Sequence, residues 1–212
     1  MPRASEKGRV SGTVPERRPT TAKLLAAAID VFSKKGLAAT TREIAEAAGV
    51  NEATLFRQFE SKDHLIEAVT REIVAEQAEA LQRVDLEDFN PRRDLTRLAI
   101  AYERAMTRHQ AYIRTMLSQP ADRRLAEKIV REVVEPLRAK FISYLAEGQR
   151  RKVVRKMNLS ASVDAFTAMI FAYVLRSAFY RAGYSRKAYL TACVDIFLEG
   201  ICRSSASMRE CK

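Results

Sequence analysis

Residues that ligate metals or build catalytic centres are scarce in this chain. Its 212 residues include two histidines, three cysteines and no tryptophan. Cys193, Cys202 and Cys211 have no C-x-x-C spacing, so a metal site has little support, and we expect the thiols to be reduced. The sequence also lacks a nucleophile–base pair and a phosphate-cradling glycine loop. We therefore expect no cofactor, no metal and no enzymatic activity, and an all-α enzyme is the least supported alternative.

Glycine and proline, which interrupt helices, are also few, at seven and six residues. Together with the abundant Ala, Leu, Arg and Glu, this composition predicts an all-α protein. The chain is long enough for one small and one larger domain with a real core. Its net charge of +11 favours attraction to nucleic acid, but the basic residues are spread out and do not locate the site.

We also find no stretch in the sequence that is typical of a membrane span or a signal peptide. The apolar run at residues 168–175 is too short to span a bilayer, and residues 1–19 lack the apolar core of a signal peptide. We therefore expect a cytoplasmic protein. Residues 1–19 are polar and rich in Arg, Ser, Gly and Pro, which predicts a disordered basic arm. Two interpretations stay open for the arm: it contacts phosphates or the minor groove, or it is a solvated tail.

Residues 40–62 carry the strongest pattern in the chain. Thr40 and Glu43 have the spacing of a capping box at the start of a short helix, and Gly49 is suited to end it. Asn51 is a preferred cap for a second helix over residues 52–59. Two short helices joined by a glycine-containing turn are typical of a helix-turn-helix. The second helix, about 12 Å long, suits a DNA major groove of about the same width.

Helical patterns flank this motif on both sides. An apolar stripe predicts a helix that starts after Pro19, with Thr20 or Thr21 as its cap, and stops at Gly36. Ser61 is placed to cap a long helix that reaches about Val84. We therefore expect a DNA-binding domain over residues 20–66. Residues 67–212 form the second, larger domain.

The stretch from Thr20 to Val69 resembles the tetracycline-repressor (TetR) family of bacterial transcriptional regulators. The residues that carry the resemblance are Ala27, Ala28, Phe32, Gly36, Thr40, Ile44, Ala45, Ala48, Gly49, Val50, Thr54, Leu55, Phe56, Phe59 and Lys62. The resemblance implies an N-terminal helix-turn-helix domain and a C-terminal helical domain for ligand binding and dimerisation. It also implies a homodimer on a palindromic double-stranded operator and control by a small molecule.

The same resemblance assigns roles to nine residues. It implies phosphate contacts at Thr41, Phe56, Gln58 and Lys62, and base contacts at Arg42, Glu52, Ala53, Thr54 and Arg57. Independently of the family, the Arg42 guanidinium could grip guanine, and Lys62 follows a helix cap where phosphate is favoured. Phe56 departs from the family's usual tyrosine, which puts one phosphate hydrogen bond in doubt. Glu52 either accepts from cytosine or only stabilises the helix N-terminus.

Helical periods continue to the end of the chain. They predict a helix that opens at Asn90-Pro91, a short one at 112–117, a long one at 121–148 kinked at Pro136, and a final pair at 160–182 and 186–202. Residues 168–175 are apolar on every side, so this helix must be buried on every side. We therefore expect the final pair to pack against a second copy as a four-helix bundle.

Aromatic residues and methionines in this domain are candidates for a ligand pocket. They are Tyr102, Met106, Met116, Phe141, Tyr144, Phe166, Met169, Ile170 and Tyr173. For each residue taken alone, ordinary core packing is the better interpretation, and the ligand is not identified by the sequence.

Taken together, these patterns favour a cytoplasmic, nucleoid-associated, ligand-responsive DNA-binding regulator that acts as a repressor. The alternative is a DNA-binding protein of the same fold that a partner controls or that does not respond to a ligand.

Overall fold

The computed structural model describes residues 19–86, 89–118, 127–180 and 182–202. The proposed basic arm and Cys211 lie outside these residues, apart from Pro19, which begins the first helix. Within them the fold is helical, and the extended backbone is limited to an isolated bridge between Val154 and Cys202. The expected all-α fold is confirmed.

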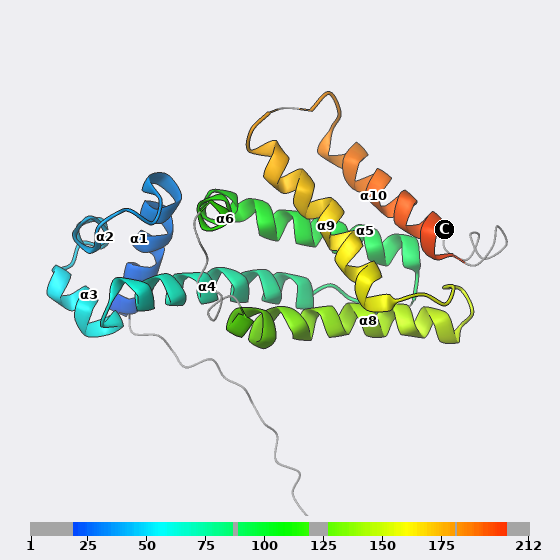
Figure 1. Cartoon of the computed structure of the whole chain (residues 1–212), viewed down its shortest axis with the longest axis horizontal. Coiled ribbons are helices and arrows are strands. Elements are labelled where there is room, and N and C mark those ends of the chain that lie inside the picture. Colours follow the sequence, from blue (N-terminus) through cyan, green and yellow to red (C-terminus); the bar gives the residue numbers. More distant parts are fainter. Residues whose placement is uncertain (1–18, 87–88, 119–126, 181, 203–212) are drawn as a thin grey trace, which may run out of the picture.

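The N-terminal domain is a small bundle at one end of an elongated molecule (Figure 1). It contains α1 (Pro19–Lys35), α2 (Thr41–Ala48), α3 (Glu52–Phe59) and the start of α4 (Lys62–Gln82). Apolar residues of these helices form one buried cluster around Phe32, Ile44 and Leu55. This core holds α2 and α3 in a fixed orientation at the tip of the molecule.

The second domain packs around the far half of α4. It contains α5 (Pro91–Arg108), α6 (Gln110–Leu117), the π-helical segment η1 (Val130–Val134), α8 (Glu135–Arg150), α9 (Leu159–Ser177) and α10 (Arg186–Ile201). Phe141, Phe166 and Phe197 meet at its centre, with ring centroids 4.7–6.3 Å apart. In Figure 1, α4 and α8 run side by side below α5, α9 crosses α5 and reaches α8 at its N-terminal end, and α10 lies above α5.

The long helix expected over residues 121–148 is interrupted just before its proline. Described residues 127–129 are α-helical, η1 follows, and Pro136 lies in the first turn of α8. A proline in a helix lacks one N–H and clashes with the carbonyl four residues earlier. The wider π turn accommodates both defects, so the predicted kink takes the form of a π segment.

Both ends of α9 and the state of one cysteine differ from the sequence-based expectation. The helix is expected to begin at residue 160, but Asn158 caps it, and the Asn158 side chain accepts from the N–H of Ala161 at 3.1 Å. The same helix ends at Ser177, short of the expected residue 182. Cys202 is disulfide-bonded, so the expectation of reduced thiols is wrong at that position, whereas Cys193 is free and buried.

By length and composition alone, α9 could cross a membrane. It has 19 residues and a mean hydropathy of 1.3. The expectation that this segment is too short came from its all-apolar centre, whereas the complete helix is longer. Only 22% of its most apolar stretch is buried within the subunit. The helix therefore presents apolar surface that one subunit does not cover.

Candidate DNA-binding surface and ligand cavity

The helix-turn-helix is built by the caps that the sequence predicts. Thr40 Oγ1 accepts from the N–H of Glu43 at 3.2 Å, and Glu43 Oε2 accepts from the N–H of Thr40 at 2.8 Å. Gly49 ends α2 with a left-handed φ of 67°. Asn51 Oδ1 accepts from the N–H of Ala53 at 2.9 Å and starts α3. These local interactions fix the angle between the two helices before any long-range packing is considered.

The capping carboxylate is also part of an ion pair. The ammonium of Lys35 donates to Glu43 Oε1 at 2.7 Å, across from the end of α1. This hydrogen bond, followed by those from the backbone and hydroxyl of Thr40, lowers the pKa of Glu43 from 4.5 to about 2. The charged form of Glu43 therefore joins α1 to α2.

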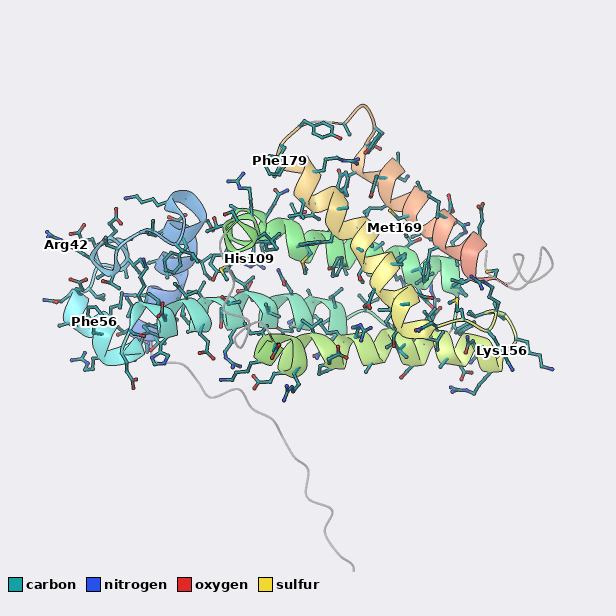
Figure 2. The ribbon with its side chains drawn as sticks, in the orientation of Figure 1. Arg42, Phe56, His109, Lys156, Met169 and Phe179 are labelled. Atoms are coloured by element: carbon teal, nitrogen blue, oxygen red, sulfur yellow. The ribbon has the colours of Figure 1, made fainter. Side chains whose placement is uncertain are left out.

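All nine residues proposed to contact DNA lie at least partly exposed on α2, α3 or the first turn of α4. Arg42, Ala53, Phe56 and Arg57 are exposed, while Thr41, Glu52, Thr54, Gln58 and Lys62 are half-buried. Leu55 and Phe59, on the opposite face of α3, are buried in the core. Figure 2 shows Arg42 and Phe56 at the same end of the molecule. The structure thus brings these residues to one surface.

Several of these side chains are held by partners within the domain. Thr41 Oγ1 donates to Glu52 Oε1 at 2.5 Å, which links α2 to α3. The guanidinium of Arg42 donates from Nε to Glu46 at 3.0 Å, one helical turn further on. Glu52 therefore has an internal hydrogen bond that sequence reasoning did not identify. That role is separate from both DNA readout and helix-dipole stabilisation.

A left-handed residue joins α3 directly to α4. Glu60 has a φ of 62° and is not glycine, so the backbone is strained at this turn. Ser61 then caps α4, with its Oγ accepting from the N–H of His64 at 3.2 Å. Lys62 lies in the first turn, where free N–H groups favour an anion. Helix α3, the second helix of the helix-turn-helix and its recognition helix, is therefore connected to α4 with no flexible linker.

Helix α6 connects the two domains. Its Tyr112 is buried in the N-terminal core, and the Tyr112 hydroxyl lies 2.8 Å from Thr70 Oγ1 on α4. On its other side, the amide of Gln110 donates to Ser177 at 3.0 Å and to the carbonyl of Val174 on α9. Helix α6 therefore contacts both α9 and the DNA-binding domain.

The junction between α5 and α6 is tied to α4 as well. His109, which ends α5, lies with Nε2 at 2.9 Å from Glu76 Oε2 on α4 (Figure 2). The imidazole is largely buried, whereas the carboxylate is partly exposed. This contact holds the start of α6 against the middle of α4.

The second domain contains a partly open, mainly apolar cavity of about 150 Å³ between α4, α5, α8 and α9. Its lining residues are Leu81, Leu86, Leu98, Tyr102, Val134, Leu137, Arg138, Lys140, Phe141, Val163, Asp164, Phe166, Thr167 and Ile170. Four residues of the sequence-based pocket set, Tyr102, Phe141, Phe166 and Ile170, line this cavity. Burial raises the pKa of Tyr102 to about 12, which keeps its hydroxyl neutral there.

The other five pocket candidates lie elsewhere. Met106 and Tyr144 are buried, and Met116 packs against the N-terminal core. Met169 is half-buried, and its carbonyl accepts from the hydroxyl of Tyr189 at 2.8 Å. Tyr173 stacks on Tyr189 with ring centroids 4.7 Å apart. These five residues do not line the cavity.

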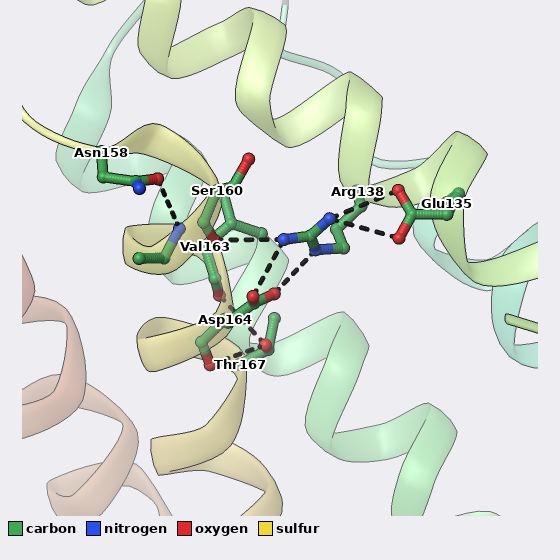
Figure 3. Close-up of polar contacts among 8 residues, drawn as sticks. Glu135, Arg138, Asn158, Ser160, Val163, Asp164 and Thr167 are labelled. Carbon is green, nitrogen blue, oxygen red and sulfur yellow. Dashed lines mark hydrogen bonds and ion pairs between the residues drawn. The ribbon is translucent and has the colours of Figure 1, made fainter. Parts of the chain in front are cut away.

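A polar bridge that the sequence did not suggest spans one edge of the cavity (Figure 3). Arg138 on α8 donates from Nε to Asp164 Oδ1 at 2.7 Å and from Nη2 to Oδ2 at 2.9 Å on α9. Its Nη1 also donates to Glu135 at 3.2 Å. These carboxylates raise the pKa of Arg138, with Asp164 the main cause. The two-point geometry fixes how α8 and α9 lie relative to each other.

Two buried acidic residues have partners and therefore serve packing. Asp94 accepts from the hydroxyl of Tyr144 at 2.8 Å and from Arg93 at 2.9 Å. Glu103 accepts from Arg186 at 2.9 Å, which ties α5 to α10. Among the described residues, no group of three His, Cys, Asp or Glu side chains could hold a metal ion.

Comparisons with known proteins agree with this architecture. Residues 24–69 match the family model described as bacterial regulatory proteins, tetR family. An uncharacterised HTH-type transcriptional regulator of Bacillus subtilis, YvkB, is 28% identical over 159 residues, which cover 74% of this chain and 82% of the relative.

Solved structures show the same fold over most of the chain. The fatty acid degradation regulator FadR of Bacillus halodurans has a TM-score of 0.73 at 17% identity, covering 87% of this chain and 97% of that one. The TetR-family regulator PfmR of Thermus thermophilus has a TM-score of 0.67 at 21% identity, covering 85% and 99%. The helix-turn-helix, the family match over residues 24–69 and the shared two-domain architecture together support a DNA-binding transcription regulator of the tetR family.

Proposed function

We propose that the protein is a homodimeric repressor that leaves its operator when a small molecule occupies the cavity. The observation that carries this proposal is the course of α4. This single helix begins beside the recognition helix at Lys62 and reaches the cavity wall at Leu81. A ligand that moves the far end of α4 therefore repositions the DNA-binding surface without any intermediate linker.

The apolar surface of α9 and α10 supports the dimer. On α9, exposed small residues recur at helical spacing, at Ala161, Ala165, Ala168 and Ala172. On α10, Ala188, Ala192 and Ile196 form a similar exposed row, and Ile196 is 61% exposed. Small residues allow close approach of a second helix pair, as in a four-helix bundle. A two-fold dimer would present two recognition helices to the half-sites of a palindrome.

Repression by such a dimer follows from occupancy of the operator. An inducer can shift the protein away from the DNA-bound state only by its preference for the other conformation. The Arg138–Asp164 bridge and the α6 contacts are the structural elements on which that preference would act. The protein would work in the cytoplasm, at the nucleoid.

A gel-shift titration with DNA flanking the gene tests the DNA-binding part. We expect sequence-preferring binding whose affinity falls as salt rises. Binding with equal affinity to unrelated DNA at every moderate salt concentration would show that the protein is not an operator-specific regulator.

Sedimentation of Ile196→Glu tests the dimer. A buried glutamate at a subunit interface is expected to yield monomers, whereas Arg131→Glu, at an exposed position on η1, leaves the dimer intact. A dimeric Ile196→Glu variant would place the interface elsewhere.

The size of the cavity supports a second candidate, control by a partner without a ligand. Pockets for small molecules are commonly about 300–1,000 Å³, and this one is smaller, at about 150 Å³. Filling the cavity with Leu98→Phe distinguishes the two. Under ligand control the variant loses its response to every inducer but keeps its operator affinity, whereas under partner control the response is unchanged.

A further inference from the structure

The apolar cavity opens beside a second, polar compartment. This groove has a volume of about 540 Å³ and is lined by Gln82, Arg83, Val84, Asp85, Leu86, Phe89, Lys140, Tyr144, Glu147 and Arg151. Leu86 and Lys140 line both spaces. The two compartments therefore adjoin at these side chains, and the first is mainly apolar whereas the second is more polar and more open to solvent.

The cations around the two compartments differ in how they are paired. Arg138 is held by Asp164 at 2.7 Å and by Glu135 at 3.2 Å. Arg83 pairs with Glu79, and Arg151 pairs with Glu147 at 2.7 Å. These three guanidinium groups are already neutralised by carboxylates of the chain.

Lys140 is different. Its ammonium donates to the carbonyl of Gln82 at 2.9 Å and to that of Val84 at 2.8 Å, at the end of α4. An ammonium has three donors, so these bonds leave one unused and leave the charge without a counter-ion. Among the cations that line either compartment in the described part of the chain, Lys140 alone has no carboxylate partner.

From this arrangement we infer that the site takes an anionic amphiphile. Its apolar tail occupies the cavity, and its carboxylate or phosphate head lies in the groove against Lys140. An apolar cavity of about 150 Å³ accepts a group the size of a benzene ring, so the tail has about six to eight carbon atoms. The inference rests on the proposed ligand control and names the chemical class of the effector.

The position of Lys140 gives this ligand a route to the DNA-binding surface. The same ammonium that would bind the head group holds the last carbonyl of α4, at Gln82, and the carbonyl of Val84 just beyond the helix. An anion that draws Lys140 into the groove weakens those two hydrogen bonds and frees the end of the helix. Head-group binding and the position of α4 are thereby linked through one side chain.

Calorimetric titration of the full-length protein at pH 7 with octanoate, octyl phosphate and 1-octanol tests the inference. The three probes share a tail and differ in the charge of the head. We expect the anions to bind about tenfold or more tightly than the alcohol, as a charge-assisted hydrogen bond provides. Whichever of octanoate and octyl phosphate binds more tightly shows whether the head group is a carboxylate or a phosphate.

Lys140→Gln is the decisive variant, because glutamine can still donate to a carbonyl of α4. It should weaken both anions about tenfold and leave 1-octanol unchanged. Lys156→Gln, at an exposed lysine that lines neither compartment, is the matched control and should change nothing. Leu98→Phe should weaken all three probes, because it fills the shared tail site.

The failure of this inference can be told apart from failure of the proposed function. Equal binding of alcohol and anions, equal weakening of all probes in Lys140→Gln, or no binding of any probe overturns the inference. Gel shifts with the same probes report separately on the function. If the anions bind in a Lys140-dependent way but never release the operator, the site is supported and ligand control is contradicted. If 1-octanol releases the operator as well as the anions do, ligand control is supported and the anion site is contradicted.

Discussion

The hydroxyl of Tyr112 on α6 donates to Thr70 Oγ1 on α4 across 2.8 Å, because the Thr70 hydroxyl itself donates to the carbonyl of Ile66. A residue from the second domain thereby completes the core of the first. Removing this hydroxyl with Tyr112→Phe should lower the free energy of unfolding by about 1 kcal/mol while the ring still fills its site. Urea denaturation measures the change, and an unaltered midpoint would show that the hydrogen bond does not contribute.

Burial of the same side chain predicts a dependence on alkaline pH. The pKa of Tyr112 is raised from 10.0 to about 12, chiefly by burial. Because the pKa of Tyr112 is raised in the folded state, the unfolded chain loses the tyrosine proton at a lower pH than the folded chain does. The stabilisation is therefore complete below about pH 10 and is lost as pH rises toward 12. Unfolding free energies measured from pH 9 to pH 12 should fall less steeply for Tyr112→Phe than for the parent chain; parallel curves would contradict this account.

Glu43 predicts the opposite dependence at acidic pH. Its pKa is lowered to about 2 by Lys35 and then by Thr40, so the charged carboxylate stabilises the folded domain above the unfolded value of 4.5. This stabilisation is lost as pH falls from 4.5 toward 2. In Glu43→Gln the slope of stability against pH should be smaller across this range. An unchanged slope in Glu43→Gln would show that this carboxylate does not contribute to the acid dependence.

Two substitutions on the DNA-binding surface should separate specificity from general affinity. Arg42→Ala should weaken binding to the operator by about 1–3 kcal/mol and affect unrelated DNA less, because a guanidinium reads guanine. Lys62→Ala should weaken all sequences similarly and reduce the salt slope by about one, because the contact proposed for Lys62 is to phosphate. Affinities measured at several salt concentrations test both roles, and a change of specificity alone in Lys62→Ala would contradict its assignment.

Gly148 marks a place where two chain segments approach α8 closely. A methyl group added there would lie 2.5 Å from Val154 Cγ2 and 2.8 Å from Phe89 Cζ. Phe89 has a left-handed φ of 42°, so its backbone has little freedom to move away. Gly148→Ala should therefore lower the free energy of unfolding by about 1–3 kcal/mol. Gly200→Ala, which meets nothing within 4 Å, should be neutral or stabilising, and thermal unfolding of both variants compares them.

Local signals explain why the DNA-binding half was predictable. The caps at Thr40, Asn51 and Ser61 act over two or three residues, so their consequences can be read from neighbouring positions. Even there the left-handed Glu60 gave no signal, because most left-handed turns use glycine or asparagine. The Thr41–Glu52 hydrogen bond also depends on how two helices cross.

The second domain was less predictable because its key contacts join distant positions. Arg138 and Asp164 meet across 26 residues, and nothing in their spacing indicates a pair. Helical periods correctly marked Phe166 and Tyr144 as buried. Periodicity shows that a side chain faces inward but not whether it meets another side chain or a void. Phe166 consequently lines the cavity, whereas Tyr144 binds Asp94.

The strained turn at Glu60 joins α3, the recognition helix, to α4 so tightly that the two helices move as one rigid unit. Only Glu60 and Ser61 separate α3 from a 21-residue helix that is roughly 30 Å long. A tilt of about 5° at the cavity end moves the tip by about 2–3 Å over that length, which is close to the rise of one base pair. In the proposed dimer both recognition helices would move, and the change in half-site spacing would double. Under the proposed ligand control, filling a cavity with room for one small ring would therefore be enough to change the fit to the operator.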